Sequence, residues 1–247
     1  MGYEQYGRTD RLDWEDASIR EWDCTVLWSD PGDPEAGIVL DRSAFYPGGG
    51  GQPPDHGVLL WGGVETRIAG TRKGDDLYLI PVEGDPLPPV DTPVTGAVED
   101  ERRSMLMRTH SGLHVLCGVV FRDFGALVTG GNMEPGEARM DFNLPEVPPD
   151  FKARLEDLVN AEVVADRQVA VKVLPRAEAL ALPDIIRTQS NLIPPDEHEI
   201  RIVDIIGLDT QADGGTHVAS TSQIGKISVV KVESKGKANR RVRVRLG

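Results

Sequence analysis

Four side chains of this sequence have the types and spacings of a metal site. His110 and His114 stand four residues apart in a stretch with helical apolar spacing, so both imidazoles lie on one face of the predicted helix. Asp213 and His217 are also four apart, in the glycine-rich stretch DGGTH after a predicted strand. Either pair alone is a weak signal, because helices often carry solvent-facing histidines and Asp-Gly-Gly suits an ordinary turn. Together they offer three nitrogens and one carboxylate oxygen, which is a plausible set for tetrahedral zinc.

A divalent metal at these four residues would support hydrolysis. If Asp213 binds weakly or leaves, the three histidines leave one coordination position for water or substrate, as at catalytic zinc sites. We therefore predict that His110, His114 and His217 are the catalytic histidines, and that these three and Asp213 bind one divalent metal, expected to be Zn2+. Cys117, three residues after His114, is an alternative ligand, and a buried thiol is its other interpretation.

A glycine-rich stretch is the third candidate motif. Residues 41–57 read DRSAFYPGGGGQPPDHG, with four successive glycines. Such a loop presents backbone N–H groups and allows close contact with a phosphate, another backbone or a small amino acid. By itself, however, a run of glycines predicts only a loop.

The elements that must position these motifs fall into two parts. Residues 1–90 have the pattern of short strands broken by turns, at 24–27, 37–40, 58–61, 64–68 and 77–80. A Pro-rich stretch at 84–92 is the predicted boundary. Residues 91–247 mix both kinds of element: helices at 99–124, 151–165 and 177–181, and strands at 93–98, 138–142, 169–173, 200–206, 227–232 and 240–246, with a loop at 207–215. The predicted fold is α+β, with a small β-barrel-like subdomain (1–90) followed by a metal-binding α/β core (91–247) that has an antiparallel sheet and packed helices.

Composition and charge limit the class of protein. The chain is 39% hydrophobic and 27% charged, which is enough to bury a core. No stretch approaches the roughly 18–20 apolar residues that span a bilayer, and the acidic N-terminus is unlike a signal peptide. We expect a soluble, cytoplasmic protein with no membrane partner. The net charge is −13, yet residues 226–247 hold eight basic residues and one acid. That basic end suits a phosphate backbone, and equally an edge hairpin whose charges prevent aggregation.

The three motifs, in this order, resemble the editing domain of alanyl-tRNA synthetase. DRSAFYPGGGGQPPDHG is similar to its glycine-rich motif, and RTHSGLHVL to its HxxxH helix. DGGTHVASTSQIGKISVVKVESKGKANRRVRV resembles its CGGTHV motif and the strand pair that ends in two arginines. The chain has no recognisable aminoacylation domain. It is therefore identified as a member of the AlaX family, the freestanding alanyl-tRNA editing proteins, of the medium-sized class, and residues 91–247 would be the editing core.

The resemblance also implies roles for individual residues. His110, His114 and His217 correspond to metal-binding histidines, whereas Asp213 stands where the family has a cysteine ligand. A carboxylate is a harder ligand than a thiolate, so Asp213 would weaken the retention of zinc or allow other ions to bind. Ser43 and Gln52 would line the amino-acid pocket, and the full predicted substrate-binding set is Ser43, Gly49, Gly50, Gln52 and Thr216. The predicted RNA-binding residues are Lys235, Lys237, Arg240 and Arg241.

The implied function is trans-editing. The protein would remove serine, with glycine as the second candidate, from mischarged tRNA(Ala) in a metal-dependent hydrolysis. A site that hydrogen-bonds the serine hydroxyl can reject alanine, whereas a synthetase pocket for alanine rejects serine poorly. Two alternatives stay open: a tRNA-binding protein whose site has decayed, and a metal hydrolase that acts on another ester. We expect no DNA partner, and the sequence does not predict the oligomeric state.

Overall fold

The computed structural model describes residues 9–30, 33, 37–74, 76–191, 193–195, 197–236 and 238–247. Within these ranges the chain forms two compact units. The N-terminal unit comprises residues up to 49 together with 53–104, and the C-terminal unit comprises 50–52 together with 105–247. The short stretch Gly50–Gln52 of the glycine-rich motif therefore belongs to the C-terminal unit.

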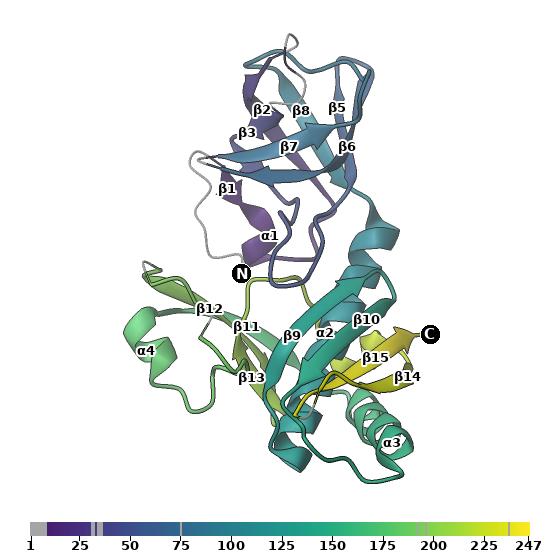
Figure 1. Cartoon of the computed structure of the whole chain (residues 1–247). Helices are drawn as coiled ribbons and strands as arrows, with labels where there is room; N and C mark the ends of the chain where they lie inside the picture. The colour runs from purple at the N-terminus through teal and green to yellow at the C-terminus, as the bar shows by residue number, and fades with distance from the viewer. Residues whose placement is uncertain are drawn as a thin grey trace. The chain divides into compact units, whose positions relative to one another are not determined.

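A closed barrel forms the N-terminal unit. Its strands follow the order β2 (Glu21–Ser29), β3 (Ile38–Leu40), β7 (Leu77–Pro81), β6 (Val64–Lys73), β5 (Gly57–Trp61) and β8 (Pro93–Val98) (Figure 1). Burial alternates along β7, as expected for a strand with one face towards a core. The short elements β1 (Asp10–Arg11), α1 (Leu12–Glu15) and β4 (Arg42–Ser43) complete the unit, with β1 and β4 paired in parallel.

Strand β8 follows the Pro-rich stretch where a domain boundary is predicted. It pairs with β2 and with β5, so it closes the barrel. The compact units instead divide after Ser104, inside helix α2 (Asp100–Phe124). The boundary between independently folding parts remains a prediction.

Two antiparallel sheets and the larger part of α2 form the C-terminal unit. The first sheet has the order β14 (Ile227–Ser234), β15 (Arg240–Leu246), β10 (Glu137–Phe142) and β9 (Val128–Glu134). The second has the order β11 (Val169–Pro175), β12 (Glu199–Ile205) and β13 (Asp209–Ala212). Helix α2 contacts both: the Gly112 backbone lies against Ile227 of β14, and the Gly118 backbone lies against Asp209 of β13.

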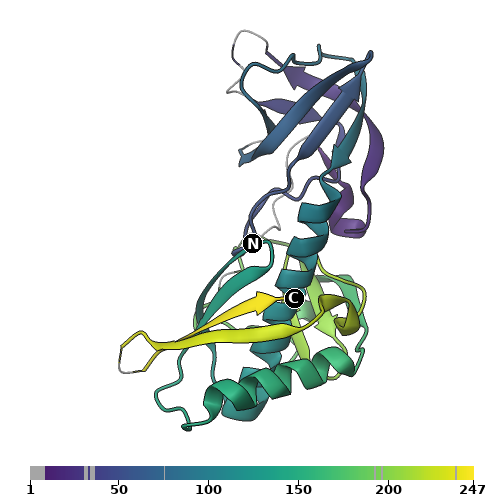
Figure 2. The ribbon, with the colours of Figure 1, turned by 90° about the vertical axis from the view of Figure 1, so that its right-hand side faces the viewer.

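The remaining helices are peripheral. Helix α3 (Phe151–Val164) packs against β14 and the 3-10 turn η2 (Thr221–Ile224), and it runs beside the sheet in Figure 2. Helix α4 (Arg176–Leu180) packs against β11 and β12. None of the helices in the described ranges is both long and apolar enough to cross a membrane.

The predicted α+β class is confirmed, whereas four strands were not predicted: the two-residue strands β1 and β4, and the longer strands β9 and β13. β13 occupies part of 207–215, which we predicted as a loop, because the polar stretch DTQA pairs with β12 despite its weak strand propensity. β9 was not predicted, because Gly130 and Gly131 interrupt the strand pattern. Strands β9 and β13 are thus ordered by pairing with a neighbouring strand rather than by the strand propensity of their own sequence.

Candidate metal centre

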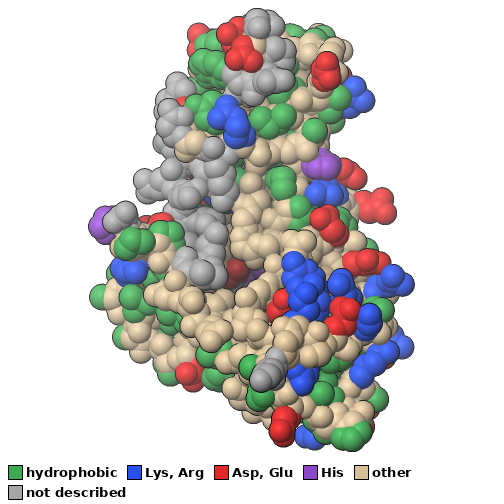
Figure 3. Space-filling model, viewed as in Figure 1, with side chains coloured by type: hydrophobic (Ala, Val, Ile, Leu, Met, Phe, Trp, Pro, Cys, Tyr) green, Lys and Arg blue, Asp and Glu red, His purple; other side chains and the backbone are tan. Residues whose placement is uncertain are grey.

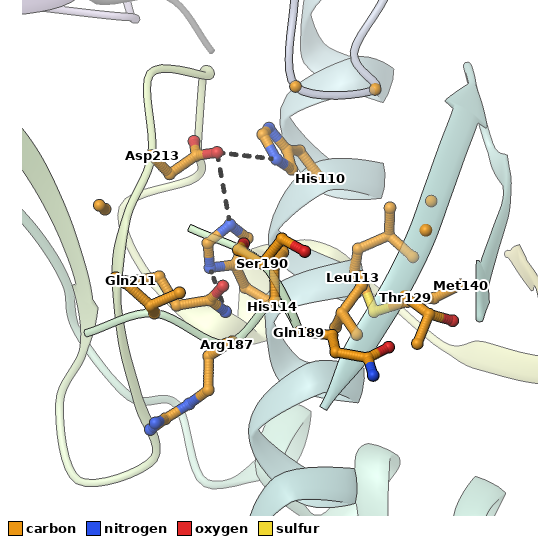
Figure 4. Close-up of a pocket in the computed structure, with 18 of the residues that line it drawn as sticks. His110, Leu113, His114, Thr129, Met140, Arg187, Gln189, Ser190, Gln211 and Asp213 are labelled. Atoms are coloured by element: carbon orange, nitrogen blue, oxygen red, sulfur yellow. Dashed lines mark hydrogen bonds and ion pairs between the residues drawn. The ribbon is translucent and has the colours of Figure 1, made fainter. Parts of the chain in front are cut away.

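The four side chains predicted as metal ligands meet in the C-terminal unit. His110 and His114 project from α2, and Asp213 and His217 come from the segment after β13. Their ligand atoms all lie within 4.8 Å of one another, and within the described part of the chain they are the one such group. Asp213 Oδ1 lies 3.6 Å from His110 Nε2 and 4.0 Å from His114 Nε2 (Figure 4). Its Oδ2 lies 3.0 Å from His217 Nε2, so the carboxylate stands between the three imidazoles.

The glycine at position 215 is required by the close approach of His110. A Cβ at this position would lie 2.2 Å from Cε1 and 2.3 Å from Nδ1 of the His110 ring, which no side chain allows. The buried Arg201 of β12 fixes the same loop by donating to the carbonyl oxygens of Asp213 (3.1 Å) and Gly215 (2.9 Å). Asp213 Oδ2 also accepts from the backbone N–H of Gly215, at 2.6 Å. The DGGTH turn is thus shaped to hold its carboxylate against the helix.

Each imidazole contacts a further residue through its Nδ1 atom, the ring nitrogen that faces away from Asp213. His114 Nδ1 lies 3.3 Å from Asp209 Oδ2, and His217 Nδ1 lies 3.2 Å from Ser111 Oγ. His110 Nδ1 lies 2.9 Å from Gln52 Oε1. Such outer partners orient the ring and select its tautomer at metal sites. The three Nε2 atoms are left to face Asp213.

The tautomer of His110 follows from the surroundings of Gln52. The backbone N–H of Thr216 donates to Gln52 Oε1 at 3.1 Å, and Gln52 Nε2 donates to Thr216 Oγ1 at 2.9 Å. These two bonds orient the amide, so Oε1 can only accept from His110. The His110 proton therefore sits on Nδ1, and the lone pair on Nε2 points into the group.

Burial and mutual charge set the protonation of the group. Burial lowers the pKa of His110 to about 4 and lowers that of His217 well below its usual value. Burial also opposes charge on His114, but the bond to Asp209 and the charge of Asp213 raise its pKa. Burial alone would raise the pKa of Asp213, yet the neighbouring imidazoles, His110 first, hold it well below its usual range. Neutral imidazoles and an ionised carboxylate are the forms that bind metal.

The donor set fits one divalent cation. Three imidazole nitrogens and one carboxylate oxygen converge from two buried segments, and the orienting residues described above are already in place. The group could therefore hold a metal ion. Cys117 is buried, burial raises the pKa of its thiol well above the usual value, and it is not a member of the group.

The predicted substrate-binding residues divide between the two units. Gln52 and Thr216 lie in the C-terminal unit, hydrogen-bonded to each other beside His110, and the Gly50 backbone lies near Asp213. Gly49 belongs to the N-terminal unit, where its carbonyl accepts from the Tyr46 hydroxyl at 3.0 Å. Ser43 also belongs to that unit, is buried, and accepts from the Phe45 N–H at 3.2 Å. Within the C-terminal unit the structure thus brings together Gly50, Gln52 and Thr216.

The basic hairpin, formed by β14 and β15, is partly neutralised by acidic neighbours. Arg241 makes a two-pronged ion pair with Asp141 of β10, with both bonds at 2.7 Å. Arg240 donates to the carbonyl of Pro145 at 2.5 Å, and Lys235 is an exposed residue of the turn. Lys237 lies outside the described residues. Figure 3 shows Lys and Arg side chains gathered over β10 and β15, with acidic side chains among them. The sequence pattern missed this pairing because the acids come from another strand.

Sequence reasoning also missed Asp209 and its partners. This carboxylate is 2% exposed and accepts from Arg187 Nε at 3.1 Å and from Gln211 Nε2 at 2.5 Å, besides its contact with His114. The Arg187 guanidinium also lies 3.9 Å from the centre of the Phe121 ring. No motif marks an aspartate in LDTQAD as a partner for a helix residue nearly a hundred positions earlier. Only the packing of β13 against α2 brings it there.

A pocket adjoins the group. His110, His114 and Asp213 form part of its wall (Figure 4). The rest comes from Gly50 and Gly51, from Leu113 and Met140, from β9, from residues 185–191 and 193, and from Gln211 and Ala212. Its volume is about 370 Å3, in the range of small-molecule sites. The candidate ligands therefore stand at the edge of a cavity.

Comparisons with known proteins show the family to which the chain belongs. Residues 200–243 match the model of the threonyl and alanyl tRNA synthetase second additional domain. The chain is 36% identical to the alanyl-tRNA editing protein AlaX-M of Saccharolobus solfataricus over 95% of this chain and 97% of that protein. It is 32% identical to AlaX-M of Methanosarcina mazei over 95% of each chain. It is also 38% identical to an alanine–tRNA ligase of Pyrobaculum neutrophilum, over 92% of this chain and 25% of the ligase. The chain belongs to the AlaX family of alanyl-tRNA editing proteins.

Proposed function

We propose that this protein is an aminoacyl-tRNA hydrolase that removes serine from mischarged tRNA(Ala) in trans, with glycine as the second candidate. The observation that carries the proposal is the buried group of three imidazoles and one carboxylate at the edge of a pocket. Support comes from the two AlaX-M relatives, which are named as alanyl-tRNA editing proteins and which this chain matches over nearly their whole length.

The proposed metal site consists of His110, His114, Asp213 and His217. A Zn2+ ion bound there would supply Lewis-acid polarisation of an ester carbonyl or of water. Gln52, Asp209 and Ser111 orient the imidazoles through their Nδ1 atoms. The ionised Asp213 offsets the charge of a cation. The Asp213 carboxylate is a harder metal ligand than the cysteine thiolate that the resemblance predicts at this position. The choice of Zn2+ over other divalent metals is therefore itself part of the proposal.

Discrimination between serine and alanine requires a polar partner for the serine hydroxyl. The proposed amino-acid contacts are Ser43, Gly49, Gly50, Gln52 and Thr216. The Gln52 and Thr216 side chains bond to each other, and the bond from Gln52 Nε2 to Thr216 Oγ1 leaves the Thr216 hydroxyl proton available for a second acceptor. Backbone N–H groups of the glycine stretch are the proposed donors to the ester oxygen.

The proposed partner is tRNA(Ala), bound in the cytoplasm through the basic hairpin. Lys235, Lys237, Arg240 and Arg241 are the proposed contacts to phosphate. Among the three of these residues that the structure describes, Arg241 has the least freedom for this role because Asp141 already occupies its guanidinium. Such contacts would provide affinity that falls with salt, while the specificity comes from elsewhere.

Release of amino acid from charged tRNA tests the proposal. Purified protein is incubated with serine-charged and alanine-charged tRNA(Ala), with and without a strong chelator. We expect rapid loss of serine, little loss of alanine, suppression by the chelator and recovery with added Zn2+. His110→Ala should abolish the release, whereas Arg67→Ala, in an exposed ion pair of the barrel, should retain it.

The other outcomes separate the alternatives. Folded, metal-loaded protein that releases no serine would refute the proposal. Tight tRNA binding without turnover would indicate a decayed site, an alternative that the aspartate at position 213 keeps open. Hydrolysis of simple esters at rates similar to charged tRNA would indicate a metal hydrolase with another substrate.

A further inference from the structure

One stretch of the chain forms a wall of the pocket and also reaches the surroundings of a candidate metal ligand. Residues 185–191 line the pocket. Backbone bonds join this segment to β9: the Val128 N–H donates to Arg187 O, and the Gln189 N–H donates to Val128 O, both at 2.8 Å. The Arg187 side chain extends instead towards α2 and β13. Arg187 therefore contacts the pocket wall through its backbone and the surroundings of His114 through its guanidinium.

Two polar contacts connect the Arg187 guanidinium to His114. Arg187 Nε donates to Asp209 Oδ1 at 3.1 Å, and Asp209 Oδ2 lies 3.3 Å from His114 Nδ1. Because a carboxylate can only accept, the proton of the neutral His114 ring sits on Nδ1, and the Nε2 lone pair faces Asp213. Figure 4 shows Arg187 on the side of His114 opposite to Asp213. A single carboxylate thus stands between the pocket wall and a candidate ligand.

The guanidinium of Arg187 is held on several sides. It is buried, lies 3.9 Å from the centre of the Phe121 ring, and donates to the carbonyl of Asp184. Asp184 has a φ of 54°, a left-handed conformation that residues other than glycine rarely adopt. Backbone strain of this kind persists only where the surrounding structure fixes it, and it clusters at functional sites. A shift of the guanidinium would therefore disturb Asp209 and the turn before the pocket wall together.

We propose that Arg187 is a positioning residue that couples the pocket wall to the candidate metal centre. The inference rests on the metal site of the proposed function. A cation at His114 Nε2 withdraws electrons from the ring and makes Nδ1–H a stronger donor to Asp209, and bonds in such a buried network strengthen one another. Asp209 then holds Arg187 more firmly, and with it the backbone bonds to β9. Coupling is reciprocal, so a substrate group that orders residues 185–191 raises the affinity for the metal.

Hydrogen exchange at the two amides that join the wall to β9 tests the coupling. Exchange at Val128 and Gln189 is followed by NMR in the full-length protein, with and without saturating Zn2+. We expect Zn2+ to slow both amides in the wild type by about fivefold or more, the lower end of typical coupling between two sites. Arg187→Met should remove this effect. If that variant fails to fold, Arg187→Lys should reduce the effect, because an amine lacks the fixed fork of donors that reaches Asp209 and the Asp184 carbonyl together.

Arg167→Met is the matched control. Arg167 also pairs with a buried carboxylate, that of Glu162, and donates to a backbone carbonyl, that of Ile206, but it does not line the pocket. In this variant Zn2+ should slow exchange at Val128 and Gln189 as it does in the wild type.

A double-mutant cycle shows whether Arg187 acts through Asp209. Arg187→Met should lower the affinity for Zn2+ by about tenfold, as loss of a residue that supports a metal ligand typically does. In the Asp209→Asn protein the same substitution should have almost no further effect, because the carboxylate that transmits it is gone. A general loss of stability would lower the affinity by the same factor in both backgrounds. Additive effects of the two substitutions, or slowing equal to the wild type in an Arg187 variant that folds, would overturn the inference.

The same measurements separate the inference from the proposed function. A wild-type protein that binds Zn2+ without slower exchange at Val128 and Gln189 would refute the coupling and leave the editing proposal standing. The expected slowing, in a protein that releases no serine from charged tRNA, would support the coupling and refute the editing proposal. A protein that binds no Zn2+ would refute the metal site and, with it, both.

Discussion

Replacing Asp209 with asparagine should weaken metal binding without removing any of the four candidate ligands. Asp209 lies 3.3 Å from His114 Nδ1, on the side of the ring away from Asp213. The asparagine keeps the size of the side chain and one acceptor oxygen, but it loses the negative charge that makes the His114 ring a stronger donor to a cation. The expected effect is lower affinity for Zn2+ in a protein that still folds.

The magnitude follows from the role of such outer partners. Loss of a residue that hydrogen-bonds a metal-binding histidine typically lowers metal affinity about 10- to 100-fold. That range corresponds to about 1.4 to 2.7 kcal/mol. The variant also leaves Arg187 without its carboxylate, and breaking a buried ion pair costs about 3–5 kcal/mol of folding stability. Arg187 keeps its bond to the carbonyl of Asp184 and its contact with Phe121, so the lower end of that range is expected.

The assay is competition for Zn2+ between the protein and a chromophoric chelator, well below the unfolding temperature. Glu162→Gln is the matched control, because Glu162 is a buried carboxylate in α3 with two arginine partners, Arg122 and Arg167, each at 2.5 Å. Both variants should unfold at lower temperature than the wild type. Only Asp209→Asn should lose affinity for the metal. Equal Zn2+ affinity in the two variants would show that Asp209 does not act through His114.

Three further outcomes follow from the same structure. Arg103→Met should lower the free energy of unfolding by about 3–5 kcal/mol in urea titrations, because it leaves the buried Asp55 carboxylate without its oppositely charged partner. The bond from Arg241 lowers the pKa of Asp141 below its usual value of 3.8. The stabilisation that Asp141 gains from Arg241 should therefore be present above about pH 4 and should fade as the pH falls below it. The measurement compares the unfolding free energy of the wild type with that of Asp141→Asn at pH 7 and at pH 3. Asp213→Cys should raise the affinity for Zn2+ relative to Mn2+ in competition titrations, because a thiolate is the softer ligand.

Each of these outcomes has a control or a contrary result. For Arg103→Met the control is Arg67→Met, which breaks an exposed ion pair with Asp85 and should leave the unfolding free energy nearly unchanged. A difference between wild type and Asp141→Asn that is as large at pH 3 as at pH 7 would rule out the ion pair as its source. An unchanged ratio of Zn2+ to Mn2+ affinity in Asp213→Cys would place residue 213 outside the coordination sphere.

Local patterns were enough to predict the pieces of the site. The spacing of His110 and His114 and the apolar positions around them predicted one face of a helix, because helical periodicity is a local property. The DGGTH motif predicted a tight turn that carries a carboxylate and an imidazole, and the structure brings this turn to the helix. The predicted barrel followed from strand alternation and turn residues in the first part of the chain.

The sequence by itself determined the types of the candidate ligands, their spacing within each segment and, through the order of its motifs, the family. Only the tertiary structure decided which partners hold those ligands. Gln52 and Thr216 are 164 positions apart, and Asp209 and Arg187 are 22 apart, yet both pairs orient a histidine. Their meeting depends on strand pairing and on the packing of α2 against β13, which no short pattern encodes. The pocket beside the candidate ligands is likewise formed in part by β9. The glycines of this strand prevent its prediction from the sequence, and it is ordered by pairing with β10.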